Sequence, residues 1–220
     1  DSQGEQVLSM VEIYKEPQDL VRRIQRGYVL IWASTLVGGA LIYFGLFWIV
    51  RRAALMLNQQ QDRLVALCRA AGVRLVGPNS LGLLNVGTRY FATFSTVLNG
   101  LQPKAGPIAL ATQSGAFGSC TYAMASLRGM GFSKIVATGN EADVDVAECI
   151  DYLAEDPDTR VICAALESCR DGTRLRTALL KAAAAGKPVL VMKVGRTELG
   201  AAAASTHTGS LAGSDEAYLD

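Results

Sequence analysis

The feature that most limits what this chain can fold into is a run of 23 residues without a charged side chain, Tyr28 to Val50. At about 1.5 Å per residue, a helix of that length crosses a hydrocarbon layer of about 30 Å. Trp32 lies near one end of the run, and Tyr43 and Trp48 lie near the other. Aromatic residues take these places at the two interfaces of membrane helices. The run therefore predicts one transmembrane helix.

Two other interpretations fit the run less well. A signal peptide has a shorter apolar stretch, starts nearer the N-terminus and ends in a cleavage site of small residues. A buried core helix of a soluble protein rarely stays uncharged over this length. The flanking basic residues, Arg26 on one side and Arg51 and Arg52 on the other, are too balanced to set an orientation by the positive-inside rule.

Helical patterns flank the run on both sides. Residues 1–27 form a polar N-terminal segment that ends in an amphipathic stretch from Asp19 to Gly27. Residues 51–71 read as a juxtamembrane helix, and Gly72 is its C-terminal stop. The block 12–63 resembles the transmembrane stalk of a bacterial membrane sensor, such as a sensor histidine kinase.

Composition excludes two classes of function. The 21 basic and 20 acidic residues leave a net charge of +1, which argues against a nucleic-acid partner. The five cysteines lack CxxC spacing, and His207 is the only histidine that could join them, so no metal site is expected. We interpret the cysteines as reduced thiols of a cytosolic portion.

From Gly72 onward, short apolar runs alternate with helical patterns. Strands are expected over 73–76, 107–112, 134–138, 160–166 and 188–194, with helices from about 115 to 129 and over 146–155 and 173–185. This alternation predicts an α/β fold, a parallel sheet with helices on both faces. Ligands bind such sheets at the carboxyl ends of the strands. The turn 113–118, Glu167 and the loop that carries His207 should therefore meet at one edge.

The turn at Ser114 and Gly115 opens a helix, whose first N–H groups and positive dipole end suit an anion. Gly115 and Gly118 would let a phosphate approach the backbone closely. An ordinary strand-to-helix turn is the other interpretation, because glycine is common in such turns.

His207 lies among small hydroxyl and glycine residues, from Ser205 to Gly213. Such a loop suits phosphate, and an imidazole nitrogen can act as a nucleophile. A solvated loop histidine is the alternative. Glu167 is either an exposed edge residue or the acceptor for an imidazole N–H, which would leave the other ring nitrogen free to take a phosphoryl group.

Five stretches follow one another in an order that is specific to one family. They are GVRLVGPNSLGLLN, GPIALATQSGAFGS, GFSKIVATGNEADVD, YLAEDPDTRVICAALES and KPVLVMKVGRTELGAAAASTHTGSLAGSD. Over about 62–220 the chain resembles the NDP-forming acyl-CoA synthetases, which include ADP-forming acetyl-CoA synthetase and are related to the succinyl-CoA synthetase α-subunit. The resemblance implies a parallel, flavodoxin-like sheet of the succinyl-CoA ligase-like type.

The resemblance also implies an acid–thiol ligase that works through a phosphohistidine relay. His207 would carry the phosphoryl group between acyl phosphate or phosphate and the nucleotide, and Glu167 would support it. The implied phosphate-binding residues are Ser114, Gly115, Ala116, Thr208 and Gly209. Asn79 is the implied CoA-binding residue. CoA and ATP/ADP with Mg²⁺ are the implied cofactors, with the nucleotide site outside this chain.

The chain departs from the family in what it contains. We expect 28–50 to be the membrane helix, 72–100 a remnant of the CoA-binding domain with a linker, and 101–220 a C-terminally truncated phosphohistidine domain. The expected partners are an ATP-grasp subunit or domain, a small carboxylic acid or its acyl-CoA, and a lipid bilayer. Without CoA-binding and ATP-grasp partners the chain is expected to be inactive. The alternatives are a non-catalytic, membrane-anchored sensor or binding protein with a degenerate ligase domain, and a fragment without independent function.

The expected location follows from the apolar run. If the run spans, the chain lies in the inner (cytoplasmic) membrane with its C-terminal domain in the cytoplasm. If it does not span, the chain is cytoplasmic.

Overall fold

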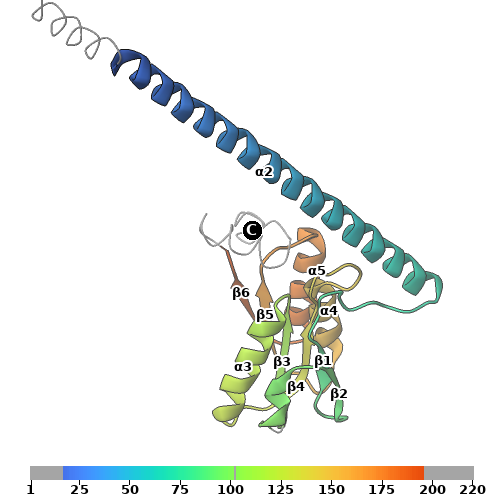
Figure 1. Ribbon diagram of the computed structural model, residues 1–220. Coiled ribbons are helices and arrows are strands. Elements are labelled where there is room, and N and C mark those ends of the chain that lie inside the picture. Colours follow the sequence, from blue (N-terminus) through green and yellow to red (C-terminus); the bar gives the residue numbers. More distant parts are fainter. Residues whose placement is uncertain (1–16, 102, 196–220) are drawn as a thin grey trace, which may run out of the picture. The chain divides into compact units, whose positions relative to one another are not determined.

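The computed structural model describes residues 17–101 and 103–195 (Figure 1). They belong to two compact units, divided between Gln59 and Gln60. The first unit holds most of a single helix, α2 (Pro17–Ala70), which is 54 residues long. The three helical stretches expected between Asp19 and Ala71 are therefore one uninterrupted helix. No proline or capping signal interrupts the sequence between them, and isolated glycines weaken a helix without ending it.

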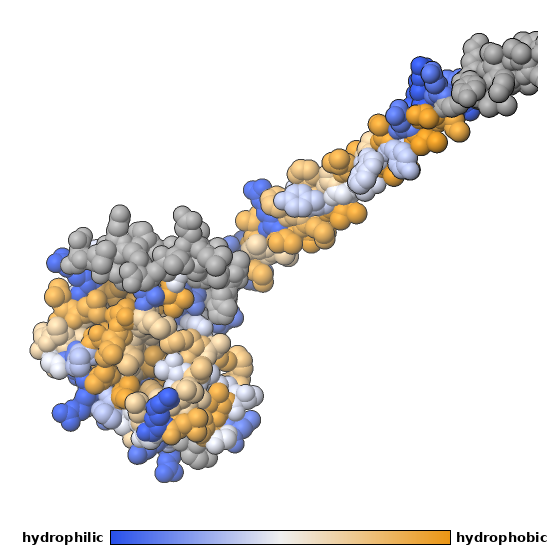
Figure 2. All heavy atoms as spheres, turned by 90° about the vertical axis from the view of Figure 1, so that its left-hand side faces the viewer, coloured by the Kyte–Doolittle hydropathy of each residue, from blue (hydrophilic) through white to orange (hydrophobic). Residues whose placement is uncertain are grey.

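The apolar part of α2 is uncovered in the described part of the chain. Its side chains between Tyr28 and Val50 are exposed (Figure 2). By length and composition the stretch from Gln18 to Ala70 can cross a membrane, and none of its most apolar window is buried. The hydroxyls of Ser34 and Thr35 donate to the carbonyl oxygen of Ile31 within the helix, at 2.9 and 2.8 Å.

The second unit is built on a six-stranded sheet with the order β2-β1-β4-β3-β5-β6. Its strands are β1 (Gly82–Asn85), β2 (Tyr90–Thr93), β3 (Ala105–Thr112), β4 (Phe132–Ala137), β5 (Val161–Leu166) and β6 (Val189–Lys193). Its helices are the 3₁₀ turn η1 (Thr96–Asn99), α3 (Gly115–Leu127), α4 (Val146–Glu155) and α5 (Gly172–Ala184). Strands β3 to β6 are parallel, so the predicted α/β fold with a mostly parallel sheet is confirmed.

Two details of the expected sheet are wrong. β1 and β2 form an antiparallel hairpin that extends the sheet beyond β4. Residues 73–76 form no strand. Their backbone groups have other partners instead: the N–H of Leu75 donates to the Asp143 carboxylate, and the carbonyl oxygen of Leu75 accepts from the N–H of Val144.

Helices cover both faces of the sheet, as the alternation of strands and helices predicts. α3 and η1 pack on one face over a cluster that includes Leu110, Tyr122 and Phe132. α4 and α5 pack on the other face over a cluster that includes Ile150 and Ile162 (Figure 1). The sheet is thereby held between two apolar layers, and the carboxyl ends of its parallel strands form one polar edge.

Candidate functional site

The turn between β3 and α3 lies at the carboxyl edge of the sheet. Ser114 caps α3, and its Oγ accepts from the N–H of Phe117 at 3.3 Å. Gly115 and Ala116 are the first residues of the helix, where N–H groups have no acceptor within the helix and the dipole favours an anion. The turn therefore presents the start of a helix at this edge, and phosphate binding there stays a prediction.

The glycines of this turn have a packing reason of their own. A Cβ at Gly115 would lie 2.5 Å from the Leu81 side chain, and a Cβ at Gly118 would lie 2.9 Å from Cγ2 of Thr112. The space beside both glycines is filled by these side chains. The lack of a Cβ at these two glycines is therefore explained by packing, and the close approach of a phosphate to their backbone stays a prediction.

Glu167 follows β5 and is buried, with 6% of its surface exposed. This excludes the interpretation of Glu167 as an exposed edge residue. Its N–H donates to Oε1 of Gln113 at 2.7 Å, and its carbonyl oxygen accepts from Nζ of Lys193 at 3.1 Å. Gln113 directly precedes Ser114, so the structure brings Glu167 and the start of α3 to the same edge.

Gln113 and Glu141 are polar residues of this edge that sequence reasoning missed. The Gln113 amide is buried and donates to the Glu141 carboxylate at 2.7 Å. Glu141 also accepts from the hydroxyl of Thr138 at 3.1 Å and from the N–H of Val146 at 2.8 Å. Burial raises the pKa of Glu141, and these three donors oppose that rise. The sequence feature that could have identified both residues is a polar side chain a few positions after an apolar strand, β3 for Gln113 and β4 for Glu141.

The turn that carries Asn79 is tied to the same edge. Nδ2 of Asn79 donates to Oδ1 of Asn140 at 3.2 Å, and the N–H of Asn140 donates to the carbonyl oxygen of Pro78 at 2.9 Å. Gly139 permits this approach, because a Cβ there would lie 2.4 Å from that carbonyl oxygen. Asn79 therefore lies beside the loop that carries Glu141.

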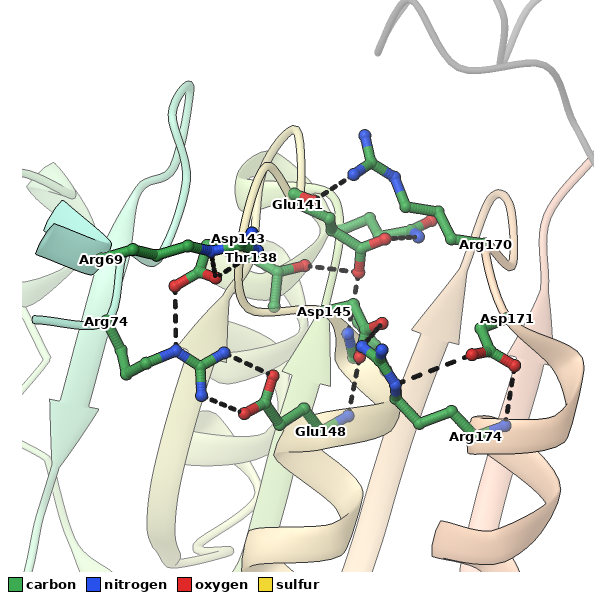
Figure 3. Close-up of polar contacts among 12 residues, drawn as sticks. Arg69, Arg74, Thr138, Glu141, Asp143, Asp145, Glu148, Arg170, Asp171 and Arg174 are labelled. Atoms are coloured by element: carbon green, nitrogen blue, oxygen red, sulfur yellow. Dashed lines mark hydrogen bonds and ion pairs between the residues drawn. The ribbon is translucent and has the colours of Figure 1, made fainter. Parts of the chain in front are cut away.

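A second polar group, shown in Figure 3, holds the last turn of α2 and the residues after it against this loop. Asp143, with 2% of its side chain exposed, accepts from Arg69 at 2.9 Å and from Arg74 at 2.9 Å. Arg74 also pairs with Glu148, at 2.5 and 2.8 Å. Hydrogen bonding by Arg74, by the N–H of Leu75 and by Arg69 holds the pKa of Asp143 well below its usual range. All charges in this group have partners of opposite sign. We therefore interpret Arg69, Arg74, Asp143 and Glu148 as a structural clamp.

The predicted residues His207, Thr208 and Gly209 lie outside the described residues. The structure therefore brings together Glu167 and the start of α3, with Asn79 on a neighbouring loop. Within 17–101 and 103–195, no group of three or more His, Cys, Asp or Glu side chains is arranged to hold a metal ion.

Comparison with known proteins adds independent information. Residues 105–220 match the family of succinyl-CoA ligase-like flavodoxin domains. ADP-forming acetate–CoA ligase I of Archaeoglobus fulgidus is 47% identical over 158 residues, which are 72% of this chain and 22% of that protein. The α-subunit of ADP-forming acetate–CoA ligase I of Pyrococcus furiosus is 39% identical over 158 residues, 72% of this chain and 33% of the subunit.

A solved structure shares the fold as well as the sequence. It is the dinucleotide-forming acetyl-coenzyme A synthetase 1 of Ca. Korarchaeum cryptofilum, in complex with phosphate and ADP. The TM-score is 0.65 at 36% identity, over 73% of this chain and 34% of that one. The chain thus spans between 22% and 34% of the length of these relatives.

Proposed function

Because the chain belongs to the NDP-forming acyl-CoA synthetase family, with a succinyl-CoA ligase-like flavodoxin domain over 105–220, we propose that it carries the phosphohistidine relay of an acid–thiol ligase. The observation that carries this proposal is the meeting of two features at one edge of the sheet. One is the buried Glu167, and the other is the helix N-terminus at Ser114 and Gly115. A phosphorylated imidazole needs both a carboxylate for its free N–H and donors for its phosphoryl oxygens.

We assign the steps to residues of this chain as follows. A ring nitrogen of His207 attacks the phosphorus of an acyl phosphate, the N–P bond forms, and the P–O bond to the acyl group breaks. The carboxylic acid leaves as its carboxylate. Glu167 accepts the N–H of the other ring nitrogen, which fixes the tautomer and stabilises the positive charge that develops on the ring.

The start of α3 serves the phosphoryl group in this scheme. The N–H groups of Gly115 and Ala116 donate to the phosphoryl oxygens, and Ser114 keeps the first turn in place. Thr208 and Gly209, next to the histidine, are assigned to the same phosphoryl group. Transfer of this kind depends mainly on positioning and on charge stabilisation.

The remaining substrate-binding sites belong to partner subunits or domains. CoA and ATP/ADP with Mg²⁺ are the proposed co-substrates, a small carboxylic acid is the acyl substrate, and the nucleotide binds an ATP-grasp subunit or domain. We assign Asn79 to CoA binding. We divide the chain into a membrane helix at 28–50, a juxtamembrane helix at 51–71, a CoA-domain remnant at 72–100 and the phosphohistidine domain from 101.

The test is phosphorylation of the chain itself. The full chain is incubated with γ-labelled ATP, Mg²⁺ and a separate ATP-grasp subunit, or with acyl-CoA, labelled phosphate and a CoA-binding partner. We expect a label that is stable in alkali and lost in acid, as a phosphoramidate is. His207→Ala should abolish the label and Ser205→Ala, in the same stretch of sequence, should keep it. A label that survives His207→Ala would contradict the role of His207.

A membrane anchor is the second proposal, and the uncovered apolar side chains of α2 favour it. The hydroxyls of Ser34 and Thr35 already have acceptors inside the helix, which suits a medium without water. We propose a single span in the inner membrane with the α/β unit in the cytoplasm. A membrane-anchored sensor without catalysis shares this anchor, and it differs in taking no label on His207.

A further inference from the structure

The Gln113 side chain makes four hydrogen bonds where three segments of the chain meet. Its Oε1 accepts from the N–H of Glu167 at 2.7 Å and from the N–H of Ser168 at 3.0 Å. Its Nε2 donates to the Glu141 carboxylate at 2.7 Å and to the carbonyl oxygen of Ser168 at 2.8 Å. A primary amide offers two hydrogens and two lone pairs, so these contacts use its full capacity.

The partners of this amide determine its orientation. Backbone N–H groups can only donate, and an ionised carboxylate can only accept. Turning the amide of Gln113 by 180° would place its NH₂ group against two N–H donors. The same turn would place its oxygen against the Glu141 carboxylate and the carbonyl oxygen of Ser168. Glu141 therefore selects the orientation in which Gln113 can hold the backbone of Glu167.

Glu141 is itself held firmly. Its carboxylate accepts from Thr138 and from the N–H of Val146, at 3.1 and 2.8 Å. Arg170 donates to its carbonyl oxygen at 2.5 Å. Its φ of 53° lies in the left-handed region, which a residue other than glycine keeps only where its surroundings impose it. Glu141 is thus a fixed acceptor for the Gln113 amide.

The Gln113 side chain continues the pairing of two strands beyond their ends. The register of β3 and β5 runs as far as Thr112 and Ala165. The N–H of Gln113 then donates to the carbonyl oxygen of Ala165 at 3.3 Å, and its side chain takes the N–H groups of the next two residues after β5. Because Gln113 is also joined to Ser114, the cap of α3, it links the place of Glu167 to the first turn of that helix.

We propose that Gln113 is a positioning residue for the phosphohistidine reaction, which holds Glu167 at a fixed place relative to the start of α3. The inference rests on the proposed function, since it takes Glu167 as the carboxylate that orients His207. Gln113 acts through the backbone of Glu167 and touches no reacting atom. Without it, Glu167 would remain in the chain but would hold the imidazole over a wider range of orientations, so that reactive geometry would be rarer.

The experiment compares the rate of histidine labelling in variants of the full chain, with the ATP-grasp partner and MgATP. Gln113→Ala should lower the maximal rate about 10-fold to 100-fold, the range seen when an outer hydrogen-bond partner of a ligating group is removed. The ATP concentration for half-maximal rate should not change, because the nucleotide binds the partner. Gln113→Glu should lower the rate at least as far, since it places a second carboxylate against Glu141.

A double variant provides the rescue. With Gln113→Glu and Glu141→Gln together, the amide at position 141 can donate to the carboxylate at position 113. That carboxylate can still accept from the N–H groups of Glu167 and Ser168. We expect labelling several-fold faster than in Gln113→Glu alone. A double variant no faster than Gln113→Glu would contradict the pairing.

Ser133→Ala is the matched control. This change also removes buried hydrogen bonds, but Ser133 lies near the start of β4, away from the carboxyl edge of the sheet. Its hydroxyl pairs with Thr159 at 2.7 Å and with the carbonyl oxygen of Ile108 at 3.2 Å. It should destabilise the fold without a comparable loss of labelling. If Ser133→Ala lowers the labelling rate as much as Gln113→Ala, the effect is one of stability and the inference is wrong.

Amide hydrogen exchange supplies a readout that needs no substrate. Gln113→Ala should speed exchange at Glu167 and Ser168, whereas Ser133→Ala should leave both unchanged. Unchanged exchange at both residues in Gln113→Ala would overturn the inference, as would an unchanged labelling rate. If the unaltered chain takes no label, the proposed function fails, and the exchange rates alone then decide whether Gln113 fixes the backbone of Glu167.

Discussion

At the scale of single residues, the Asp143 carboxylate joins the last turn of α2 and the residues after it to the loop between β4 and α4. Its buried carboxylate accepts from Arg69, Arg74 and the N–H of Leu75. Hydrogen bonds to a charged group contribute about 1.5 to 3 kcal/mol each, a net value that already includes the exchange with water. Both arginines are more than half exposed, so solvent screening reduces their share.

We predict that Asp143→Asn lowers the free energy of unfolding by about 2 kcal/mol at neutral pH. The folded-state pKa of Asp143 lies below its unfolded value. Its stabilisation is therefore complete above the unfolded pKa of about 4 and is lost progressively as the pH falls from there through the lower folded-state pKa. Denaturant unfolding of the full chain in detergent, at neutral pH and at about pH 3, measures the difference between the two proteins.

Asp151→Asn is the control for this prediction, because Asp151 pairs with Lys181 at 2.8 Å at a partly exposed position. That change should lower the free energy of unfolding much less than Asp143→Asn does. Equal losses in the two variants would contradict the clamp, as would a loss from Asp143→Asn that does not shrink in acid.

Part of the site could be predicted from single residues, and part could not. Ser114 at a strand-to-helix turn was predicted from its position alone, because caps act over three residues. The roles of Gln113 and Glu141 depend on contacts across 28 residues of sequence, and no spacing rule expresses such a contact. The position of Glu167 at the carboxyl edge of the sheet was predicted from the sequence. Its burial was not, because burial depends on how β5 and β6 pack.

At the scale of elements, the start of α3 is shaped by the loop that precedes β1. Leu81 fills the space beside Gly115, so that a Cβ there would lie 2.5 Å from its Cδ1. Gly172 occupies the same position in α5, where a Cβ would have no neighbour within 4 Å. The two glycines therefore differ only in what packs against them.

We predict that Gly115→Ala destabilises the fold by about 1 to 3 kcal/mol, the cost of an extra methyl group in a filled site. Gly172→Ala should be neutral or stabilising, because alanine forms helices better than glycine. Leu81→Ala should make Gly115→Ala less harmful than it is in the unaltered chain. Denaturant unfolding of the unaltered chain, the three single variants and the Leu81→Ala/Gly115→Ala double variant gives the values. An equal effect at Gly115 and Gly172, or no coupling to Leu81, would contradict this packing.

The elements that the sequence predicted best have local causes. Helix α4 (Val146–Glu155) has the predicted bounds because Asp145 caps one end and Asp156–Pro157 closes the other. The hairpin of β1 and β2 was missed because each strand has only four residues and β2 is mostly exposed. Residues 73–76 look like a strand but have the 141–145 loop as their hydrogen-bond partner, a contact that only the tertiary fold creates.

At the scale of the whole molecule, the chain joins a succinyl-CoA ligase-like flavodoxin domain to a helix whose apolar side chains are exposed in the described residues. Leu41 and Leu57 are almost equally exposed on this helix, 69% and 70%. Leu41 lies inside the uncharged run and Leu57 lies after it. Replacing each of them by lysine therefore compares a position inside the proposed membrane span with a position outside it.

We predict that the full chain stays with membranes during carbonate extraction and that Leu41→Lys reduces the retained fraction. A lysine near the middle of a span costs about 2.5 to 3.5 kcal/mol on insertion scales. Leu57→Lys should have little effect, because this position lies outside the proposed span. Recovery of the unaltered chain in the soluble fraction, or equal effects of the two lysines, would contradict the anchor.

The most direct measurement for the account as a whole is the position of the phosphoryl group on the chain. The full chain is phosphorylated with the ATP-grasp partner and MgATP, digested at alkaline pH, and mapped by mass spectrometry. We predict one phosphoryl group, on the peptide that contains His207, which is lost after brief treatment with acid and is absent from His207→Ala. A phosphoryl group on any other residue, or none on a folded chain with an active partner, would contradict it.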